Sequence, residues 1–511
     1  MALAAALLSA LAIWWNLRHG YLLYYGDAQA HLVNARRMVD SRTPGLDQLG
    51  TVWLPLPHLL MLPFVRVEEW WRTGLAGSIP SGACFVLATA FLYAAARRIL
   101  DSRAGAAAAV LVFALNPNVL YLQSIPMTES FYFAGFFGLL YAMAWYARTG
   151  SVWAVLLAGA ASNAASLTRY EGWFLIPFAA LFFAFAGRRR LLMGVVFGGV
   201  ASAAVLAWLA HNWWYYGDAL AFYRGPYSAM AIYQRALDAG MEKYPGDHDW
   251  WKAWTQFRAA AGLCAGGALT VLGVAGIAAA LWRRAFWAVA FLALPAGFYV
   301  WSIHSSGTPI FVPGLWPHSY YNTRYGLAAL PLLVVCAGSL AAVVPARMRG
   351  VAAVLIAAVA AAPWVAYPRA ESWICWKESQ VNSEARRQWT AEAAAYLEAN
   401  YRRGEGIYSS LGDLAGIYRE ARIPLKEVLQ EGNNPQWDAV KQRPDLFLRE
   451  GWAVAISGDD VSTTLVRSGR RGPRYVCVKM ITVKGGPAIE IYRRDSETNE
   501  NTLHQGAWRK E

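Results

Sequence analysis

The sequence predicts a helical membrane protein that crosses the bilayer many times and ends in a small α/β domain. Of the 511 residues, 57% are hydrophobic and 15% are charged, whereas about 25% are charged in a typical globular protein. Apolar runs recur throughout residues 1–367, while residues 368–511 hold 22 of the 46 basic and 20 of the 33 acidic residues. We therefore expect a transmembrane domain over 1–367 and a soluble α/β domain over 368–511.

The apolar runs have the length of membrane spans. A spanning helix needs about 20 apolar residues, with a range of roughly 17–25. The first run, "MALAAALLSALAIWW", lacks the basic start and the cleavage site of a signal peptide, so we expect it to be retained as a span. The proline-containing segment 52–65 suits an interfacial helix better than a span. We predict eleven spans, at 2–18, 75–97, 104–121, 129–147, 152–168, 172–187, 191–210, 259–281, 285–302, 325–345 and 350–367.

The loops between the spans differ in charge. Five short loops hold 11 of the 24 basic residues of region 1–367 but only one acid, Asp101. The segments on the other side, of which 19–74 is the first, hold 11 of the other 12 acids, and the twelfth, Glu129, is the first residue of the fourth span. Short loops rich in Lys and Arg remain cytoplasmic. We therefore expect an integral protein of the bacterial cytoplasmic membrane, in contact with its lipids, with extracytoplasmic long loops and C-terminal domain.

The C-terminal region alternates strand and helix patterns. The stretches "GIYSS", "WAVAIS", "RYVCVKMITV" and "AIEIYRR" predict strands. A helix is expected over 383–406, and helical pieces near 411–421 and 459–468. No basic stripe lies on this module, which argues against nucleic-acid binding. Cys375 and Cys477 both lie in the tail and could pair in an oxidising compartment.

The first external segment contains "GDAQAH", with Asp27 and His31 one helical turn apart. Asp27 could cap a helix that starts here. It could also accept a proton from an acceptor hydroxyl, or hold a divalent cation through its carboxylate oxygens. His58, in the apolar setting of "VWLPLPHLL", is more typical of a packed and hydrogen-bonded histidine than of a ligand.

Charged residues also stand where later spans begin, and these are functional candidates because charge is costly at membrane depth. Glu129 opens the fourth span, where a helix dipole favours a carboxylate, so an ordinary helix start is the alternative. Arg169 and Glu171 flank Tyr170 between two spans, and they either form ion pairs or, for Arg169, hold a phosphate.

The motif "WPHSYYNTRYGLAALPLL" places Arg324 and Tyr325 at the start of the tenth span, with His318 nearby. Interface tyrosines form belts in many membrane proteins and carry little information alone. Arg324 is more informative, because a guanidinium at this depth can bind the phosphate of a bilayer lipid or of a lipid-linked substrate.

The order of these motifs resembles the GT-C membrane glycosyltransferases, in particular bacterial relatives of protein O-mannosyltransferases and aminoarabinose transferases. It runs from "GD" after the first span, through "WLPLPHLL", "LYAAARRIL", "SIPMTES" and "SLTRYEGWFLIP", to "YYGDALAFY" and "TRYGLAALPLL". The resemblance covers residues 1–367 and, more loosely, the tail. The family's early acid is often one of a pair, but Ala28 follows Asp27 here, so Glu129 is expected to supply the second acid.

The resemblance implies transfer of a sugar, with inversion, from a polyprenyl-phosphate donor to a glycan, lipid or protein acceptor on the outer membrane face. Asp27 would be the general base, and Glu129 would assist it, position the acceptor or help hold a divalent cation. The implied substrate-binding residues are Arg324, Arg169, Tyr170, Glu171, His31, His58, Tyr325 and His318.

Two other classes of function stay open. A transporter or flippase for a lipid-linked or small polar substrate would show repeats and polar residues near mid-membrane, whereas these span interiors are almost free of charge. A non-catalytic membrane scaffold with an external binding domain would fit the same topology. Asp27→Asn separates the enzyme from the scaffold, because only the enzyme needs the carboxylate.

Overall fold

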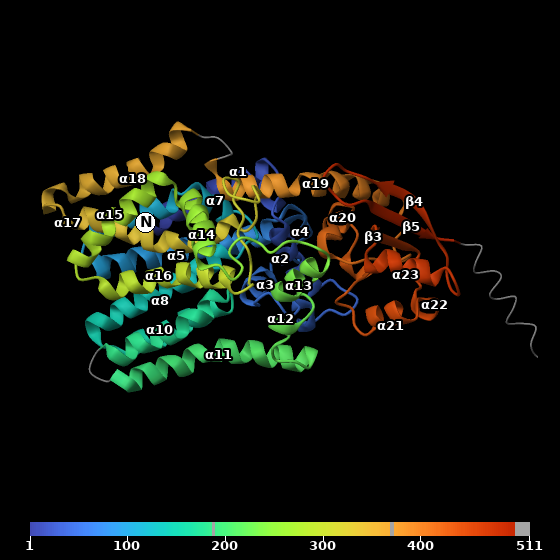
Figure 1. Ribbon diagram of the computed structural model, residues 1–511, viewed down its shortest axis with the longest axis horizontal. Coiled ribbons are helices and arrows are strands. Elements are labelled where there is room, and N and C mark those ends of the chain that lie inside the picture. Colours follow the sequence, from blue (N-terminus) through green and yellow to red (C-terminus); the bar gives the residue numbers. More distant parts are fainter. Residues whose placement is uncertain (187–189, 368–371, 496–511) are drawn as a thin grey trace, which may run out of the picture. The chain divides into compact units, whose positions relative to one another are not determined.

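The computed structural model describes residues 1–186, 190–367 and 372–495 and is mainly helical (Figure 1). It consists of two compact units. The first comprises Met1–Leu22, Thr51–Leu60 and Gly77–Val381. The second comprises Leu23–Gly50, Met61–Ala76 and Asn382–Glu511. The expected boundary at 367/368 therefore lies at 381/382 in the structure, and most of the predicted external segment 19–74 groups with the tail.

Direct contacts explain why these N-terminal residues belong to the second unit. Arg42 forms an ion pair with Glu450 at 2.7 Å. The amide of Asn433 donates to the Ser41 hydroxyl at 2.8 Å, and the backbone N–H of Leu425 donates to Asp40 at 3.2 Å. These are polar contacts between residues almost 400 positions apart, and charge patterning along the chain does not reveal them.

The first unit is a helical assembly whose elements follow the predicted spans. The helices up to the middle of the unit are α1 (Ala2–Arg18), α3 (Leu56–Met61, continuing into the second unit by one residue), α5 (Leu75–Leu100), α6 (Arg103–Ala114), α7 (Pro117–Gln123), α8 (Glu129–Thr149), α9 (Val152–Ser166) and α10 (Glu171–Phe185). The others are α11 (Arg190–Tyr216), α12 (Ala221–Arg224), α13 (Ala229–Asp238), α14 (Trp250–Ala265), α15 (Gly267–Trp282), α16 (Phe286–His304), α17 (Leu330–Val343), α18 (Arg349–Ala366) and the start of α19 (Ile374–Asn400). Short 3-10 helices are η1 (Tyr21–Leu23), η3 (Thr323–Ala329) and η4 (Ala346–Met348).

Each of the eleven predicted spans coincides mainly with helix, although several run one or two residues past a helix end, and position 187 lies outside the described residues. Within the described ranges, five helices are long and apolar enough to cross a membrane, and seven spans result if each of two bent pairs counts as one. The apolar helices α1, α9 and α10 are shorter. The chain is therefore an integral membrane protein, and Figure 1 shows α10 and α11 packed side by side.

Two predicted spans are bent rather than continuous. Segment 104–121 breaks between α6 and α7 by 66°, because Asn116 caps α7 and Pro117 lacks the N–H that would continue α6. Segment 259–281 breaks between α14 and α15 by 107° at Gly266, whose φ is 81°. The Asn116 side chain donates to the carbonyl of Cys264 at 2.9 Å, which joins the two breaks.

The second unit contains a five-stranded sheet in the order β2-β1-β3-β5-β4. β1 runs parallel to β2 and β3, and β5 runs antiparallel to β3 and β4. The strands are β1 (Ile407–Tyr408), β2 (Val428–Leu429), β3 (Trp452–Ile456), β4 (Tyr475–Ile481) and β5 (Ile489–Arg494). Four of them match the predicted strands. β2 was not predicted, because a strand of two residues is too short to show an alternation of apolar and polar side chains.

The core of this unit includes Tyr408, Trp437 and Leu465. The helices of the unit are α2 (Gly26–Arg37), α4 (Glu68–Thr73), α20 (Ala415–Glu420), α21 (Gln436–Gln442), α22 (Pro444–Phe447), α23 (Asp460–Ser468), η2 (Leu46–Leu49), η6 (Gly412–Leu414), η7 (Leu425–Glu427) and the remainder of α19. The helix predicted at 383–406 begins at Ile374 instead. Cys375 and Cys477 are free thiols, the first buried in the first unit and the second exposed in the second unit.

Candidate functional site

A buried cluster of charged side chains lies in the first unit, where apolar helices begin. Glu129 and Glu171 occupy the first turns of α8 and α10, and helix dipoles stabilise carboxylates there. Arg169 joins them: its Nε lies 2.8 Å from Glu171 and its Nη1 lies 3.0 Å from Glu129. Arg169 also donates to Tyr299 at 2.6 Å. With the Thr128 hydroxyl at 2.8 Å, it has four partners for its five N–H donors.

Arg324, in η3, adds a second guanidinium to the cluster. It is 6% exposed. Its Nε lies 3.3 Å from Glu129, and its Nη1 lies 3.6 Å from Glu378. These distances are longer than those around Arg169, so Glu129 and Glu378 attract Arg324 electrostatically but form weaker hydrogen bonds with it.

Glu378 fixes the backbone on which Arg324 is mounted. Its carboxylate accepts from the backbone N–H of Asn322 at 3.0 Å and of Thr323 at 2.7 Å. The Thr323 hydroxyl donates to the same carboxylate. Asn322 has a left-handed backbone, with φ of 53°, so these bonds stabilise a turn that an isolated chain would rarely adopt. The first turns of α19 thus hold η3 in place.

Tyrosine rings line the cluster. The Tyr325 ring lies 5.1 Å from the Arg169 guanidinium carbon and 4.9 Å from that of Arg324, which are cation–π distances. Tyr299 stacks on Tyr325 with centroids 4.7 Å apart and donates to Glu171. The rings keep the two arginines apart from bulk water and restrict their rotamers.

A small pocket opens at this cluster, and both acids and both arginines line it together with Tyr132, Phe133, Tyr299, Tyr325, Leu327 and Ala328. Two polar atoms there, the Glu129 Oε2 and the Tyr132 hydroxyl, are buried without a hydrogen-bond partner among the described residues. Buried polar atoms are normally paired. The pocket can therefore offer an acceptor and a hydroxyl to a polar ligand, beside the cations.

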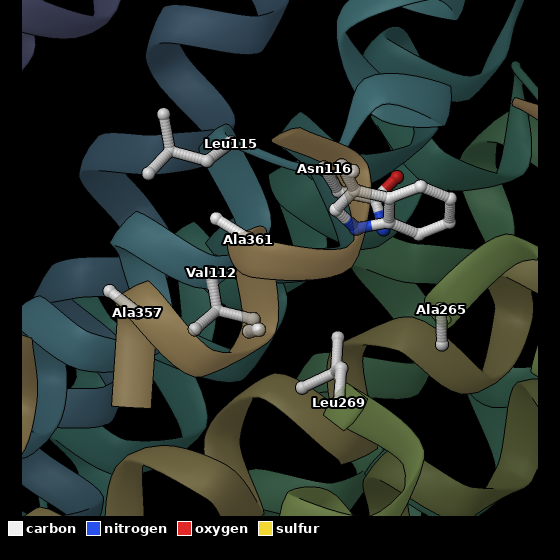
Figure 2. Close-up of a pocket in the computed structure, with 9 residues that line it drawn as sticks. Val112, Leu115, Asn116, Ala265, Leu269, Ala357 and Ala361 are labelled. Carbon is white, nitrogen blue, oxygen red and sulfur yellow. The ribbon is translucent and has the colours of Figure 1, made fainter. Parts of the chain in front are cut away.

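A second pocket, shown in Figure 2, has a different character. It is bordered by Val112 of α6, by Leu115 just after that helix, by Leu269 of α15, and by Ala357 and Ala361 of α18. Its polar groups are the Asn116 amide, which already donates to the carbonyl of Cys264, and the indole N–H of Trp364. Nothing in this lining offers acid–base or phosphate chemistry, so the pocket at Glu129 is the candidate site.

Asp27 and His31 lie in the second unit, in α2, so the predicted convergence of Asp27 and Glu129 on one site stays a prediction. The cap of α2 is Tyr25, without a side-chain cap bond. Asp27 occupies the first turn instead, which removes the capping interpretation and leaves the carboxylate near the positive end of the helix dipole. His31 is buried.

The remaining predicted residues lie apart from the pocket lining. His58 is fully buried and stacks on Trp53 at 6.4 Å, as expected for a packed histidine. Tyr170 donates to the carbonyl of Val52 at 2.7 Å and stacks on Phe222. The His318 side chain is exposed and contacts the carbonyl of Pro313 at 3.1 Å.

The predicted cation role is a poor fit for Glu129. Its Oε1 faces two guanidinium groups, which would repel a divalent cation. Over the described ranges, no group of three or more His, Cys, Asp or Glu side chains has the arrangement of a metal site. The two guanidinium groups are recorded beside Glu129 and not beside Asp27, so a cation held by Asp27 stays a prediction.

Sequence reasoning missed Glu378, Tyr299 and Tyr132. Glu378 lies in a polar helix that reads as part of the soluble domain. Tyr299 and Tyr132 lie inside spans, where tyrosine is common. Of these three residues, only Glu378 could have been singled out in the sequence, because it closely follows the apolar stretch "WICW" at the start of the tail.

Comparisons with known proteins identify the fold. The family model of dolichyl-phosphate-mannose-protein mannosyltransferases matches residues 71–215. The chain resembles ArnT from Cupriavidus metallidurans bound to undecaprenyl phosphate, with 13% identity, coverage of 94% of this chain and 97% of that chain, and a TM-score of 0.56. For ArnT in the apo state the identity and coverage are the same and the TM-score is 0.50.

The Archaeoglobus fulgidus oligosaccharyltransferase AglB, in complex with an inhibitory peptide and a dolichol-phosphate, gives 14% identity, coverage of 89% and 69%, and a TM-score of 0.46. No curated protein sequence matches the chain. The likeness to ArnT over almost the whole of both chains shows that this chain has the GT-C fold. The predicted fold class and the predicted resemblance to the GT-C superfamily are confirmed.

Proposed function

From this GT-C fold we propose that the chain is an inverting glycosyltransferase that uses a polyprenyl-phosphate-linked sugar at the outer face of a bacterial cytoplasmic membrane. The observation that carries the proposal is the buried pocket at Glu129, in which two arginines are positioned by three glutamates. The undecaprenyl phosphate bound to ArnT supports the same class of ligand here.

In the proposed reaction, an acceptor hydroxyl attacks the anomeric carbon of the donor while Asp27 takes the hydroxyl proton. The bond between the anomeric carbon and the phosphate oxygen breaks, which releases polyprenyl phosphate and transfers the sugar with inversion. Arg324 offsets the charge that grows on the leaving phosphate. Glu129 keeps Arg324 in place and offers its Oε2 to a hydroxyl of the substrate.

The geometry divides the two arginines by role. Arg169 already has four partners and therefore suits the role of organising Glu129 and Glu171. Arg324 has longer contacts and stands on a backbone fixed by Glu378, so it suits phosphate binding.

The test is a transfer assay with purified protein. Undecaprenyl-phosphate-linked mannose, glucose, arabinose and aminoarabinose are supplied in turn with a membrane extract as acceptor, and released undecaprenyl phosphate is measured. We expect one donor to be consumed by the parent chain and by Asp413→Asn, an exposed acid outside the site, but not by Asp27→Asn. Equal consumption by Asp27→Asn would contradict the proposed base.

A further inference from the structure

Asn118, in α7, is a fully buried residue that joins the ends of two other helices of the first unit. Its amide nitrogen donates to the carbonyl of Cys264 at 3.1 Å, and its amide oxygen accepts from the backbone N–H of Cys375 at 3.0 Å. Cys264 lies in the last turn of α14 and Cys375 in the first turn of α19. Backbone groups at helix ends have no partner within their own helix, so Asn118 pairs one group from each end.

Both helix ends that Asn118 holds also contact the start of η3. The Cys264 thiol donates to the carbonyl of Thr323 at 3.1 Å. Glu378 follows Cys375 by three residues on α19, and its carboxylate accepts from the backbone N–H of Thr323 at 2.7 Å. The contacts therefore form a closed ring of buried residues, whose members are Asn118, Cys264, Thr323, Glu378 and Cys375.

A second residue of α7 strengthens the link to α19. Tyr121 follows Asn118 by three residues, and its hydroxyl lies 2.8 Å from the hydroxyl of Ser379, the residue after Glu378. Both hydroxyl-bearing side chains are buried. α7 thus contacts α19 at Cys375 and at Ser379, on either side of Glu378 in the sequence, and these contacts restrict movement of the turn that carries the Glu378 carboxylate.

We propose that Asn118 is a positioning residue for phosphate binding by Arg324, an inference that rests on the proposed function. Among the described residues, Asn118 is not one that lines the pocket at Glu129, so it acts through the ring and not on the ligand. Bonds between a guanidinium and a phosphate depend strongly on geometry. Loss of the Asn118 amide unpairs one backbone group at each helix end, so that α14 and α19 can shift and Glu378 no longer fixes the backbone that carries Arg324.

The experiment compares two ligands with the same polyprenyl chain: undecaprenyl phosphate, and undecaprenol, which lacks the phosphate. Both are titrated into the purified full-length protein in detergent, and the ratio of their dissociation constants measures the preference for the phosphate. We expect Asn118→Ala to reduce this preference by about 10-fold to 100-fold, as displacement of a binding group does, while undecaprenol binds as it does to the parent chain. A general loss of folded protein would instead weaken the binding of both ligands equally.

Asn163 provides a matched control in the same unit. It lies in α9, and its amide donates to the carbonyl of Val200 at 3.0 Å and accepts from the backbone N–H of Ala204 at 3.1 Å, both in α11. It therefore forms the same two kinds of bond as Asn118, but to a helix outside the ring. We expect Asn163→Ala to lower the melting temperature and to keep the preference of the parent chain for the phosphate.

Arg324→Ala separates this proposal from the proposed function. If Arg324→Ala loses the preference and Asn118→Ala keeps it, or if Asn118→Ala weakens both ligands equally, the positioning role is overturned and the phosphate site stands. If the parent chain shows no preference, or if Arg324→Ala keeps it, the phosphate site fails and this proposal fails with it. Should Asn118→Ala not fold, Tyr121→Phe removes only the hydroxyl that contacts Ser379 and is expected to reduce the preference by a smaller factor. An unchanged preference in Tyr121→Phe would then overturn the proposal.

Discussion

Arg169 and Arg419 are both largely buried, but carboxylates balance their charges to different degrees. In the first unit, Arg169 and Arg324 face Glu129, Glu171 and Glu378, and the arginine with the shortest contacts has four partners. In the second unit, Arg419 has one weak bond to an exposed glutamate. The first arrangement is preorganised, and the Glu129 Oε2 and the Tyr132 hydroxyl are the polar atoms that it leaves for a ligand. The second offsets the burial of its cation less well.

The largest effect is expected from Glu378→Ala. The substitution leaves the N–H groups of Asn322 and Thr323 and the Arg324 guanidinium without their buried acceptor. We expect a loss of about 3–5 kcal/mol in the free energy of unfolding, measured by thermal and chemical denaturation in detergent. Glu384→Ala, an exposed position on the same helix, is the control. Equal stability of the two variants would show that Glu378 does not hold η3.

The next effect concerns catalysis. We expect Asp27→Asn to lower the rate of sugar transfer by about 10²–10⁴-fold, as loss of a general base does, with little change in melting temperature. Its position in the first turn of α2 requires no cap bond from the side chain. A large drop in stability with proportionate loss of activity would instead indicate a structural role.

A matched pair of substitutions tests the comparison itself. Arg169→Met removes the cation between two buried glutamates, and we expect a loss of about 3–5 kcal/mol in the free energy of unfolding. Arg419→Met removes a buried cation that is paired only with the largely exposed Glu420, and we expect a gain of about 1 kcal/mol in the free energy of unfolding. Changes of the same sign and size would mean that the surroundings of Arg169 and Arg419 do not differ as described.

The smallest effect is a pH dependence in the loop before α14. Burial raises the pKa of Asp247, but bonds from Ser306 at 2.6 Å, His248 at 2.8 Å and Tyr233 at 3.1 Å outweigh it, and the pKa is lowered. A carboxyl whose folded-state pKa lies below its unfolded value of about 3.9 stabilises the fold above that pH.

This stabilisation is lost as the pH falls through the lower, folded-state pKa. We expect Asp247→Asn to reduce the melting temperature slightly at neutral pH and to flatten its decline in acid. Glu242→Gln, which is exposed, should follow the parent chain at every pH. If the melting temperature of Asp247→Asn declined in acid as that of the parent chain does, Asp247 would not be the source of this stabilisation.

The sequence predicted much of the first cluster because its charges interrupt apolar runs. Glu129, Arg169, Glu171 and Arg324 each stand at the start of a span, where a charge is conspicuous and costly. Tyr299 was missed because its neighbours are equally aromatic. The grouping of residues 23–50 with the tail also escaped prediction, since it depends on contacts such as Arg42 with Glu450.

The burial of Arg419, by contrast, could not be predicted from the sequence. In the sequence it is one of many charges in a polar region, and the stretch "GIYRE" is typical of an ordinary amphipathic helix. Its burial depends on Gly416, which allows α20 to approach α19 closely. Burial of a charge among polar neighbours is a tertiary property, so neither composition nor spacing could reveal it.

The most direct test of the proposed function measures the binding of undecaprenyl phosphate to purified variants by native mass spectrometry. Arg324→Ala is compared with Arg347→Ala, an exposed arginine just beyond the other end of α17. We predict that the parent chain and Arg347→Ala retain the lipid phosphate and that Arg324→Ala loses it while remaining folded. Equal retention by Arg324→Ala would contradict the assignment of the pocket at Glu129 as the phosphate site.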